Sequence, residues 1–280
     1  FPSIANRVSY TLNLNGPSMP VDTMCSSSLV AIQMACESIK KGECKLAIAG
    51  GVNIYSHPST FVNLSRMKLV SQDGRTRSFG EGGTGFVPGE GVGAILLKPL
   101  KEAEREGDNI YAVIKGGAVT HSGRTNGYFV PNPEAQAALI NKALSDARVS
   151  AESISYIEAM AVGSETGDAI EIDGLSKVFS KHNTDNSIVI SSVKPNIGHA
   201  EAASGMAQLM KVLLQMKYKT FVPSLYADQE NHRIKLSGTR FHIQKSIGAW
   251  NRRATIQNGK TQEHPRRAGI SSFGAGGTGA

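Results

Sequence analysis

Cys25 lies in a segment that could carry a nucleophile. The segment Val21–Ser28 (VDTMCSSS) joins a short predicted strand, Ser18–Thr23, to a predicted helix, Ser26–Lys41. A cysteine at a helix N-terminus meets free backbone N–H groups and the positive end of the helix dipole. Both effects lower the pKa of a thiol and favour the thiolate, and the same N–H groups can bind an oxyanion. A small buried cysteine beside a helix cap is the alternative interpretation.

His199 is the second residue that could do chemistry. It lies in the segment Ser192–Glu201 (SVKPNIGHAE), which has the pattern of a strand end, a turn and the start of a helix. A histidine in such a turn can act as a hydrogen-bond donor or as an acid or base. Lys194, Asn196 and Glu201 lie in the same segment and could support it. A helix-capping turn with incidental polar groups is the alternative.

The other reactive residue types give weaker signals. The chain has three cysteines, Cys25, Cys36 and Cys44, and no CxxC spacing. This argues against a disulfide framework and against a zinc site, so we expect no bound metal. The glycines of Gly80–Gly93 lead into a predicted strand and do not open a helix, which excludes a dinucleotide fingerprint. The segment Gly274–Gly279 (GAGGTG) could offer N–H groups to an oxyanion or form a bare turn.

The composition is that of a globular chain with scattered positive charge. Of 280 residues, 40% are hydrophobic and 30 are glycine, which indicates many tight turns. The net charge of +7 fits either a solvated surface or a dock for an acidic partner. No recognised nucleic-acid-binding motif accompanies it. No run of about 18 apolar residues predicts a membrane span. The absence of a signal-peptide pattern and the cysteine usage favour a reducing, cytoplasmic location.

Alternating apolar runs and amphipathic stretches predict an α/β fold. The order of elements places Cys25 and His199 each between a strand and a helix. Residues Ser56–Pro88 are predicted to be mostly loop. The further predicted strands are Leu46–Val52, Gly93–Leu97, Ile110–Thr120, Ile154–Met160, Ile188–Ser192, Arg240–Gln244 and Arg267–Ser272, and the further predicted helices are Leu100–Glu106, Pro133–Ala147, Ala169–Ser180 and Glu201–Met216.

Several of these motifs together resemble those of β-ketoacyl synthases. The segment Asp22–Leu29 (DTMCSSSL) resembles the active-site elbow of that family. The segment Thr125–Tyr128 (TNGY) and the glycine-rich Gly80–Gly91 loop are most similar to ketosynthase domains of modular polyketide synthases served by free-standing acyltransferases. Four further segments agree with the family, in its order along the chain: Ser3–Tyr10, Gly85–Gly91, Val193–His199 and Arg267–Gly274.

The resemblance implies a thiolase-like fold, layered α-β-α-β-α with two related halves, and a homodimer. Residues 1–280 would form part of a ketosynthase domain, with about 1–130 completing the N-terminal half and about 131–280 forming the C-terminal half. It also implies that about a third of the domain precedes Phe1. Acyl chains would arrive on the phosphopantetheine arm of acyl carrier protein. We therefore expect no bound cofactor, and as partners acyl carrier protein domains and adjacent polyketide synthase domains.

The resemblance also implies roles for individual residues. Cys25 matches the nucleophile, and His199 matches the second catalytic histidine of the family. Lys194 and Glu201 match the supporting pair. The N–H of Cys25 and one in the Phe273–Gly277 loop would form the oxyanion hole. The positions that match substrate-binding residues are Phe273, Gly274, Asn196 and Ser164.

Met160 departs from the family pattern. The first catalytic histidine of the family follows a Glu-Ala pair and opens a His-Gly-Thr-Gly-Thr run, whereas here residues 158–159 are followed by Met160–Ser164 (MAVGS). A thioether has no proton to donate, so it cannot polarise a malonyl thioester. Val162 also replaces a hydroxyl that would help hold the pantetheine arm. The pattern resembles non-elongating ketosynthases, so we expect acyl transfer through Cys25 without decarboxylative condensation. Two alternatives stay open: an elongating synthase that tolerates Met160, and a non-catalytic scaffold or gate.

Overall fold

A parallel four-stranded sheet lies at the centre of the second half of the chain. The structure, a computed structural model, describes residues 3–180, 187–257 and 260–280. All neighbouring strands of this sheet are parallel, an arrangement that needs crossover connections and is covered by helices on both faces. In spatial order the strands are β11 (Ala268–Ile270), β4 (Tyr156–Glu158), β5 (Ile188–Ser191) and β7 (Phe241–Ile243).

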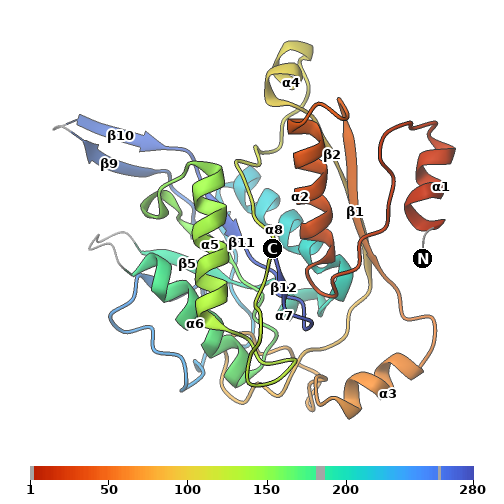
Figure 1. Cartoon of the computed structure of the whole chain (residues 1–280). Coiled ribbons are helices and arrows are strands. Elements are labelled where there is room, and N and C mark those ends of the chain that lie inside the picture. The colour runs from red at the N-terminus through yellow and green to blue at the C-terminus, as the bar shows by residue number, and fades with distance from the viewer. Residues whose placement is uncertain (1–2, 181–186, 258–259) are drawn as a thin grey trace.

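Helices cover both faces of this sheet (Figure 1). Helices α5 (Pro133–Ala147) and α6 (Glu165–Phe179) pack together on one face, over the main hydrophobic core. Helix α8 (Ser204–Tyr218) lies on the other face, over a smaller aromatic core. The main core includes Ile157, Ile172, Leu175, Ile188 and Ile190, and the aromatic core includes Tyr156, Val212, Phe221 and Trp250.

A second, antiparallel sheet comes from the first half of the chain. Strand β1 (Ala47–Asn53) pairs with β2 (Gly91–Leu97) over seven residues each. Helix α2 (Ser27–Lys40) contacts both β1 and α8, and a third core joins them. The layers therefore run from α5 and α6 through the parallel sheet and then α8 with α2 to the β1–β2 pair (Figure 1). The third core is built on Ile32, Ala49 and Met206.

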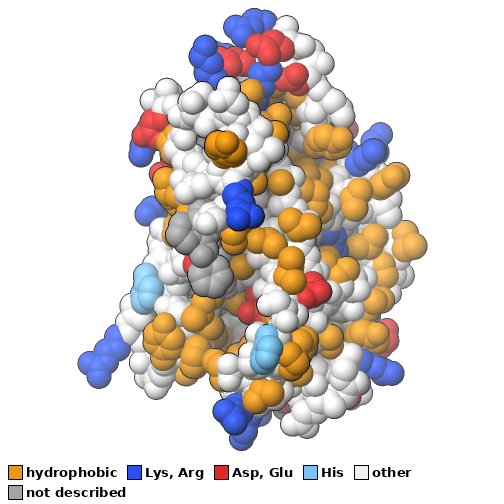
Figure 2. All heavy atoms as spheres, turned by 90° about the vertical axis from the view of Figure 1, so that its right-hand side faces the viewer, with side chains coloured by type: hydrophobic (Ala, Val, Ile, Leu, Met, Phe, Trp, Pro, Cys, Tyr) orange, Lys and Arg blue, Asp and Glu red, His pale blue; other side chains and the backbone are white. Residues whose placement is uncertain are grey.

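The outer face of the β1–β2 pair is apolar and exposed. Ile48, Val92 and Leu96 point outward with 43%, 82% and 66% of their surface accessible. Figure 2 shows hydrophobic side chains spread over this side of the molecule. An apolar sheet face of this kind is typical of a surface that another element or chain covers.

The remaining elements are short. No helix in the described ranges has the length and apolar character that crossing a bilayer requires. The helical ones are α1 (Ser3–Thr11), α3 (Ser59–Arg66), α4 (Leu100–Glu106), the 3-10 turn Ala151–Ser153, α7 (Lys194–Ile197) and the 3-10 turn Glu201–Ala203. The strands are β3 (Thr120–His121), β6 (Thr220–Phe221), β8 (Gly248–Ala249), β9 (Arg253–Gln257), β10 (Lys260–His264) and β12 (Thr278–Gly279).

Two predicted strands of the first half are wrong, and one helix was not predicted. The segment Ser18–Thr23 is not a strand, since only Thr23 makes an isolated bridge, to Cys25. Of the predicted strand Ile110–Thr120, only Thr120 is in a strand, because no strand of the described chain pairs with residues 110–119. Residues 56–88 are mostly loop, as predicted, but they also contain α3, an eight-residue helix without a buried side chain.

Two differences in the second half have local causes. Helix α6 begins at Glu165 and not at Ala169, because the Ser164 hydroxyl accepts the Gly167 N–H at 3.2 Å and caps the helix earlier. The acidic residues of its first turn are therefore Glu165 and Asp168. The β9–β10 hairpin was missed, although Ala254 and Ile256 alternate with polar residues and an Asn-Gly pair typical of hairpin turns follows in the sequence. The β10 sequence (KTQEH) has no apolar residue.

Glu158 ties the parallel sheet to α8 and to the chain that enters α7. Its carboxylate is fully buried, lies 3.0 Å from Lys211 Nζ and accepts the Val193 N–H at 2.6 Å and the Tyr156 hydroxyl. Lys211 also donates to Ser191 Oγ at 2.8 Å. This network fixes the backbone immediately before Lys194.

Replacing Glu158 should destabilise the fold strongly. In Glu158→Ala the buried Lys211 ammonium loses its countercharge, so the free energy of unfolding should fall by about 3–5 kcal/mol, measured by chemical denaturation. The control is Glu134→Gln, which breaks an exposed pair with Lys177 at 2.9 Å and should change the stability little. Equal effects of the two substitutions would contradict this account of the network.

Candidate active site

Cys25 lies in a tight turn immediately before α2. Met24 has a φ of +57°, and the Thr23 N–H donates to Ser27 Oγ at 2.9 Å. The Ser26 hydroxyl lies 2.9 Å from the Thr23 carbonyl and 3.0 Å from that of Thr278. The turn is therefore held by the first residues of the helix and by the C-terminal strand. Cys25 is half-buried at the helix N-terminus.

His199 contacts Cys25 directly. The imidazole is fully buried, and its Nε2 lies 3.2 Å from the Cys25 sulfur. The N–H of Glu201 donates to Nδ1 of the same ring at 3.2 Å. A neutral imidazole carries one proton, and Nδ1 is occupied as an acceptor, so the proton is on Nε2. His199 therefore donates a hydrogen bond to the sulfur.

The His199 ring and backbone are fixed by the loop before β2. The ring packs edge-on against Phe86, with centroids 4.7 Å apart. The His199 N–H donates to the Val87 carbonyl at 2.8 Å, and the Gly89 N–H donates to the His199 carbonyl at 3.0 Å. The preceding Gly198 has a φ of +78°, which a residue with a Cβ adopts only at a cost. Burial and the Lys194 charge lower the pKa of His199 well below its usual value, so the ring is neutral.

Burial raises the pKa of the Cys25 thiol to about 11. The Lys194 charge and the backbone N–H groups of Ala275 and Cys25 itself lower it, and the Glu201 charge raises it further. The predicted lowering of this pKa is therefore wrong, because desolvation outweighs the favourable charges around the sulfur. The thiol of the free protein is protonated at neutral pH and has to lose its proton as the sulfur attacks.

The C-terminal loop supplies backbone donors beside the sulfur. The backbone N–H groups of Ala275 and Cys25 lower the pKa of the Cys25 thiol. A Cβ at Gly274 would lie 2.3 Å from the Thr23 carbonyl oxygen, so only glycine permits this close approach. Phe273 pairs with Gly279 and closes the loop. The two N–H groups have the chemistry of an oxyanion hole.

Lys194 is a buried cation behind the site. It begins α7 with 1% of its surface exposed, and its Nζ is without a hydrogen-bond partner among the described residues. Burial lowers the pKa of Lys194, and the charges of Glu158 and Glu171 oppose this shift. The two oxygens of Glu171 accept the N–H groups of Met160 and Ala161, each at 2.8 Å. Lys194 acts on Cys25 as a nearby positive charge.

Met160 and Cys25 both contact Ser272. Its side chain is buried, and its sulfur lies 3.7 Å from the Ser272 hydroxyl. That hydroxyl donates to the Cys25 carbonyl at 2.7 Å. Within the described ranges, His199 is the only imidazole that hydrogen-bonds to Cys25. The site therefore offers one imidazole donor, with a thioether beside it.

Two predicted binding residues lie apart from the sulfur. Ser164 is half-buried and serves as the cap of α6. Asn196 is exposed on α7. Among the hydrogen bonds of the described chain, neither side chain bonds to Cys25 or His199. Tyr55, in contrast, was not predicted, yet its hydroxyl hydrogen-bonds to the Glu201 carboxylate. It follows β1 in a loop whose sequence carries no motif that would have indicated it.

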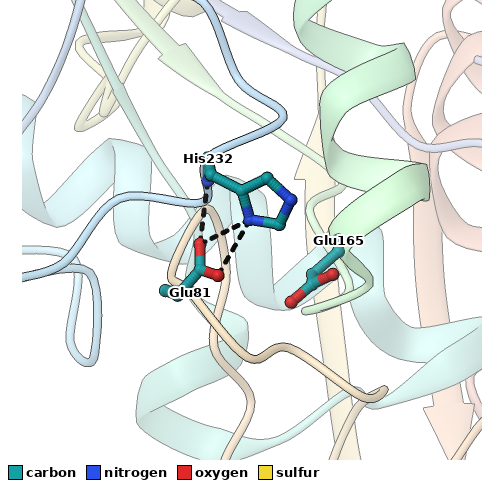
Figure 3. Close-up of side chains that lie close together, drawn as sticks. All are labelled: Glu81, Glu165 and His232. Carbon is teal, nitrogen blue, oxygen red and sulfur yellow. Dashed lines mark hydrogen bonds and ion pairs between the residues drawn. The ribbon is translucent and has the colours of Figure 1, made fainter.

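A separate cluster of ionisable side chains lies on the surface (Figure 3). His232 donates its backbone N–H to Glu81 at 2.8 Å, and its Nδ1 lies 2.8 Å from the same carboxylate. Glu165 completes the cluster and pairs with Arg233 at 3.6 Å. These bonds join the chain around Glu81 to the start of α6 and to the segment around His232. They account for the grouping as a structural clamp.

Comparison with known proteins identifies the family. Residues 2–103 match the Beta-ketoacyl synthase, N-terminal domain, and residues 111–228 match the Beta-ketoacyl synthase, C-terminal domain. The chain belongs to the β-ketoacyl synthase family. It is 53% identical over 279 residues to polyketide synthase PksL of Bacillus subtilis, covering 99% of the chain and 6% of that protein. It is 50% identical to polyketide synthase ThaG of Burkholderia thailandensis, covering 99% of the chain and 5% of that protein.

Solved structures show the same fold. The oxazolomycin ketosynthase domain OzmH KS7 of Streptomyces albus superposes with a TM-score of 0.96 at 47% identity, over 100% of this chain and 49% of that one. The ketosynthase from module 6 of the bacillaene synthase of B. subtilis gives a TM-score of 0.91 at 39% identity, over 98% of this chain and 48% of that one. The chain therefore has the thiolase-like fold of polyketide synthase ketosynthases and spans about half the length of these solved chains.

The pKa of Cys25 gives a pH-dependent reactivity. We expect the rate of alkylation of Cys25 by iodoacetamide to keep rising with alkaline pH, because the thiolate fraction grows until the pH passes about 11. Lys194→Met should slow alkylation near neutral pH, since loss of the positive charge raises the thiol pKa further. Mass spectrometry of the intact protein follows the reaction. A rate that levels off near neutral pH would contradict the buried, protonated thiol.

Proposed function

We propose that this chain belongs to a polyketide synthase ketosynthase that accepts an acyl chain on Cys25 and passes it on without decarboxylative condensation. The observation that carries the proposal is Met160, at the position that resembles the first catalytic histidine of the family. Its thioether is buried 3.7 Å from the Ser272 hydroxyl, which donates to the Cys25 carbonyl. Acyl transfer needs the sulfur and an oxyanion hole. The His199 contact with Cys25 Sγ and the N–H groups of Cys25 and Ala275 around it support this role.

Every bond and proton of the proposed transfer step can be assigned to groups at the site or on the carriers. The Cys25 sulfur attacks the carbonyl of an acyl thioester on the carrier, and the carbonyl oxygen becomes an oxyanion that the N–H groups of Cys25 and Ala275 can bind. The C–S bond to the carrier breaks, and the proton lost by Cys25 ends on the departing pantetheine thiol. In the second half-reaction the thiol of the downstream carrier attacks the Cys25 thioester by the reverse path. His199 Nε2–H donates to the sulfur while charge develops on it.

Decarboxylative condensation needs one more hydrogen-bond donor than acyl transfer does. Decarboxylation of a malonyl thioester puts negative charge on the thioester oxygen, and stabilising that enolate needs a donor in addition to the oxyanion hole. Met160 has no proton to donate. Removing one donor of this kind typically lowers a rate by about 10²–10³-fold. A site with a single imidazole donor therefore favours transfer over elongation.

The partners follow from this reaction. Acyl carrier protein domains would deliver and remove the chain on their phosphopantetheine arms, adjacent polyketide synthase domains would flank this one, and the domain would act as a homodimer. The exposed apolar face of β1 and β2 supports an assembly in which another part of the protein or a second copy covers this face.

The organisation of the site around sulfur favours catalysis over a purely scaffolding role. His199 Nε2 lies 3.2 Å from Cys25 Sγ. Two backbone N–H groups and the buried Lys194 all lower the pKa of the thiol. A scaffold would need none of these donors. An elongating synthase that tolerates Met160 is the second candidate, because His199 and Lys194 are both in place.

Replacing the nucleophile separates enzyme from scaffold. In Cys25→Ala the intact protein that carries this chain should lose acyl loading and transfer to the downstream carrier, because no other group forms the thioester. Cys36→Ala is the matched control, since Cys36 packs beside the core of α2 and not at the site, and it should leave transfer intact. Intact-mass spectrometry of the carriers provides the measurement. Transfer that survives Cys25→Ala would support the scaffold.

Met160→His should restore condensation only in part. The new imidazole would supply the missing donor, but Ala161, Val162 and Ser164 also depart from the family pattern around it. We expect an elongated product to appear at a rate well below that of a ketosynthase with both histidines. Met160→Leu provides the control, because it keeps the apolar volume and should give none. If the unchanged protein already elongates as fast as Met160→His, the role assigned to Met160 is wrong.

A further inference from the structure

We propose that Tyr55 is a positioning residue of the active site, which acts through Glu201 on His199. The inference rests on the proposed acyl transfer at Cys25 for its catalytic consequence, but its geometry stands independently. Tyr55 lies in the loop after β1, far in sequence from both residues, and it belongs to none of the motifs by which the family resembles this chain.

Three consecutive contacts connect Tyr55 to the nucleophile. The Tyr55 hydroxyl donates to Glu201 Oε1. The backbone N–H of Glu201 donates to His199 Nδ1 at 3.2 Å. His199 Nε2 in turn lies 3.2 Å from Cys25 Sγ. A change at the Tyr55 hydroxyl can therefore reach the sulfur through one carboxylate, one backbone amide and one imidazole.

Glu201 is held in a backbone conformation that residues with a Cβ disfavour. Its φ is +38°, and such conformations persist where surrounding contacts impose them, often at functional sites. Here the contacts are its N–H to His199 Nδ1 and its carboxylate to Tyr55. Without the Tyr55 hydroxyl, Glu201 would lose one of these two contacts and could relax, which would move its N–H away from Nδ1.

The loop of residues 87–90 holds both Tyr55 and His199. The Tyr55 N–H donates to Glu90 Oε1 at 2.5 Å, and its ring packs against Phe61 with centroids 5.0 Å apart. The backbone of residues 87–89 holds His199 through the bonds described above, and Asn53 Nδ2 donates to the Gly89 carbonyl at 2.9 Å. The hydroxyl is therefore placed rigidly relative to the imidazole.

The hydroxyl keeps His199 in the tautomer that the site needs. With Nδ1 accepting from Glu201, the ring proton stays on Nε2 and points at the sulfur. If the Glu201 N–H moves away, the proton can occupy Nδ1, and Nε2 then no longer donates to Cys25. The thiolate would lose a donor, and the pKa of Cys25 would rise. The groups that face Cys25 besides His199 are Lys194, Glu201 and the Ala275 N–H.

The decisive experiment is Tyr55→Phe, which removes only the hydroxyl. We expect iodoacetamide to alkylate Cys25 about tenfold more slowly near neutral pH, with the profile moved to higher pH, because a hydrogen bond to a charged group is lost from the chain of contacts. The rate of Cys25 acylation at saturating acyl carrier should fall similarly, while the carrier concentration for half-saturation stays the same. Tyr218→Phe, at an exposed site, is the control and should change neither rate.

Combining Tyr55→Phe with substitutions of Glu201 distinguishes a positioning role of Tyr55 from an effect of the Glu201 charge. In Glu201→Ala, Tyr55→Phe should have no further effect, since the acceptor is gone. In Glu201→Gln the amide oxygen can still accept the Tyr55 hydroxyl, so Tyr55→Phe should again slow alkylation, although no charge is present. Loss of the effect in Glu201→Gln, or its persistence in Glu201→Ala, would overturn the proposal. So would an unchanged alkylation profile in Tyr55→Phe itself.

The readouts keep the two proposals apart. Alkylation needs no acyl substrate, so it tests Tyr55 even if the unchanged protein fails to accept an acyl chain. In that case the proposed function fails, and the alkylation rates alone decide whether Tyr55 has the positioning role. Thermal unfolding of each variant provides the check on folding, because Tyr55→Phe keeps the ring contact with Phe61 and should retain the unfolding temperature.

Discussion

The 3.2 Å contact between His199 Nε2 and Cys25 Sγ is the constraint on which the rest of the structure depends. It joins the turn before α2 to the turn after β5, which are separated by 174 residues. The first turn opens α2, which packs on β1, and the second follows β5 of the parallel sheet, so the layers must pack closely for the two side chains to meet. The C-terminal loop completes the contact, because Ser272, Gly274 and Ala275 all approach the Cys25 turn.

Burial has opposite effects on the two groups in this contact. It raises the pKa of Cys25 and lowers that of His199, so both are neutral in the free protein. Neutral partners have no ion-pair attraction, and the site relies on fixed donors around the sulfur. Under the proposed function, these donors would act when charge develops during acyl transfer. Met160 would leave an enolate without the donor that the family's first histidine supplies, while the donors that serve Cys25 are kept.

Much of the fold and of the site could be predicted from local sequence, because the informative residues lie in continuous motifs. Helix α5 matches its predicted bounds, since Asn132 caps it and its apolar pattern is regular. Two turn motifs singled out Cys25 and His199, and the resemblance to the family implied that they act together. The pKa of Cys25 was wrong because desolvation depends on what packs over the turn. Helix α3 was missed because it has no buried face. Tyr55 was missed because its partner, Glu201, lies 146 residues away in the sequence.

The proposed function requires that the acyl chain leaves Cys25 with the same length that it had on arrival. One measurement tests this directly. Cys25 is loaded from an acyl carrier in the intact protein, a malonyl-loaded downstream carrier and an unloaded one are offered together, and both carriers are weighed by mass spectrometry. The account predicts the original acyl mass on the unloaded carrier and no change on the malonyl carrier. An acyl chain longer by one malonyl-derived unit, with loss of carbon dioxide, would contradict it.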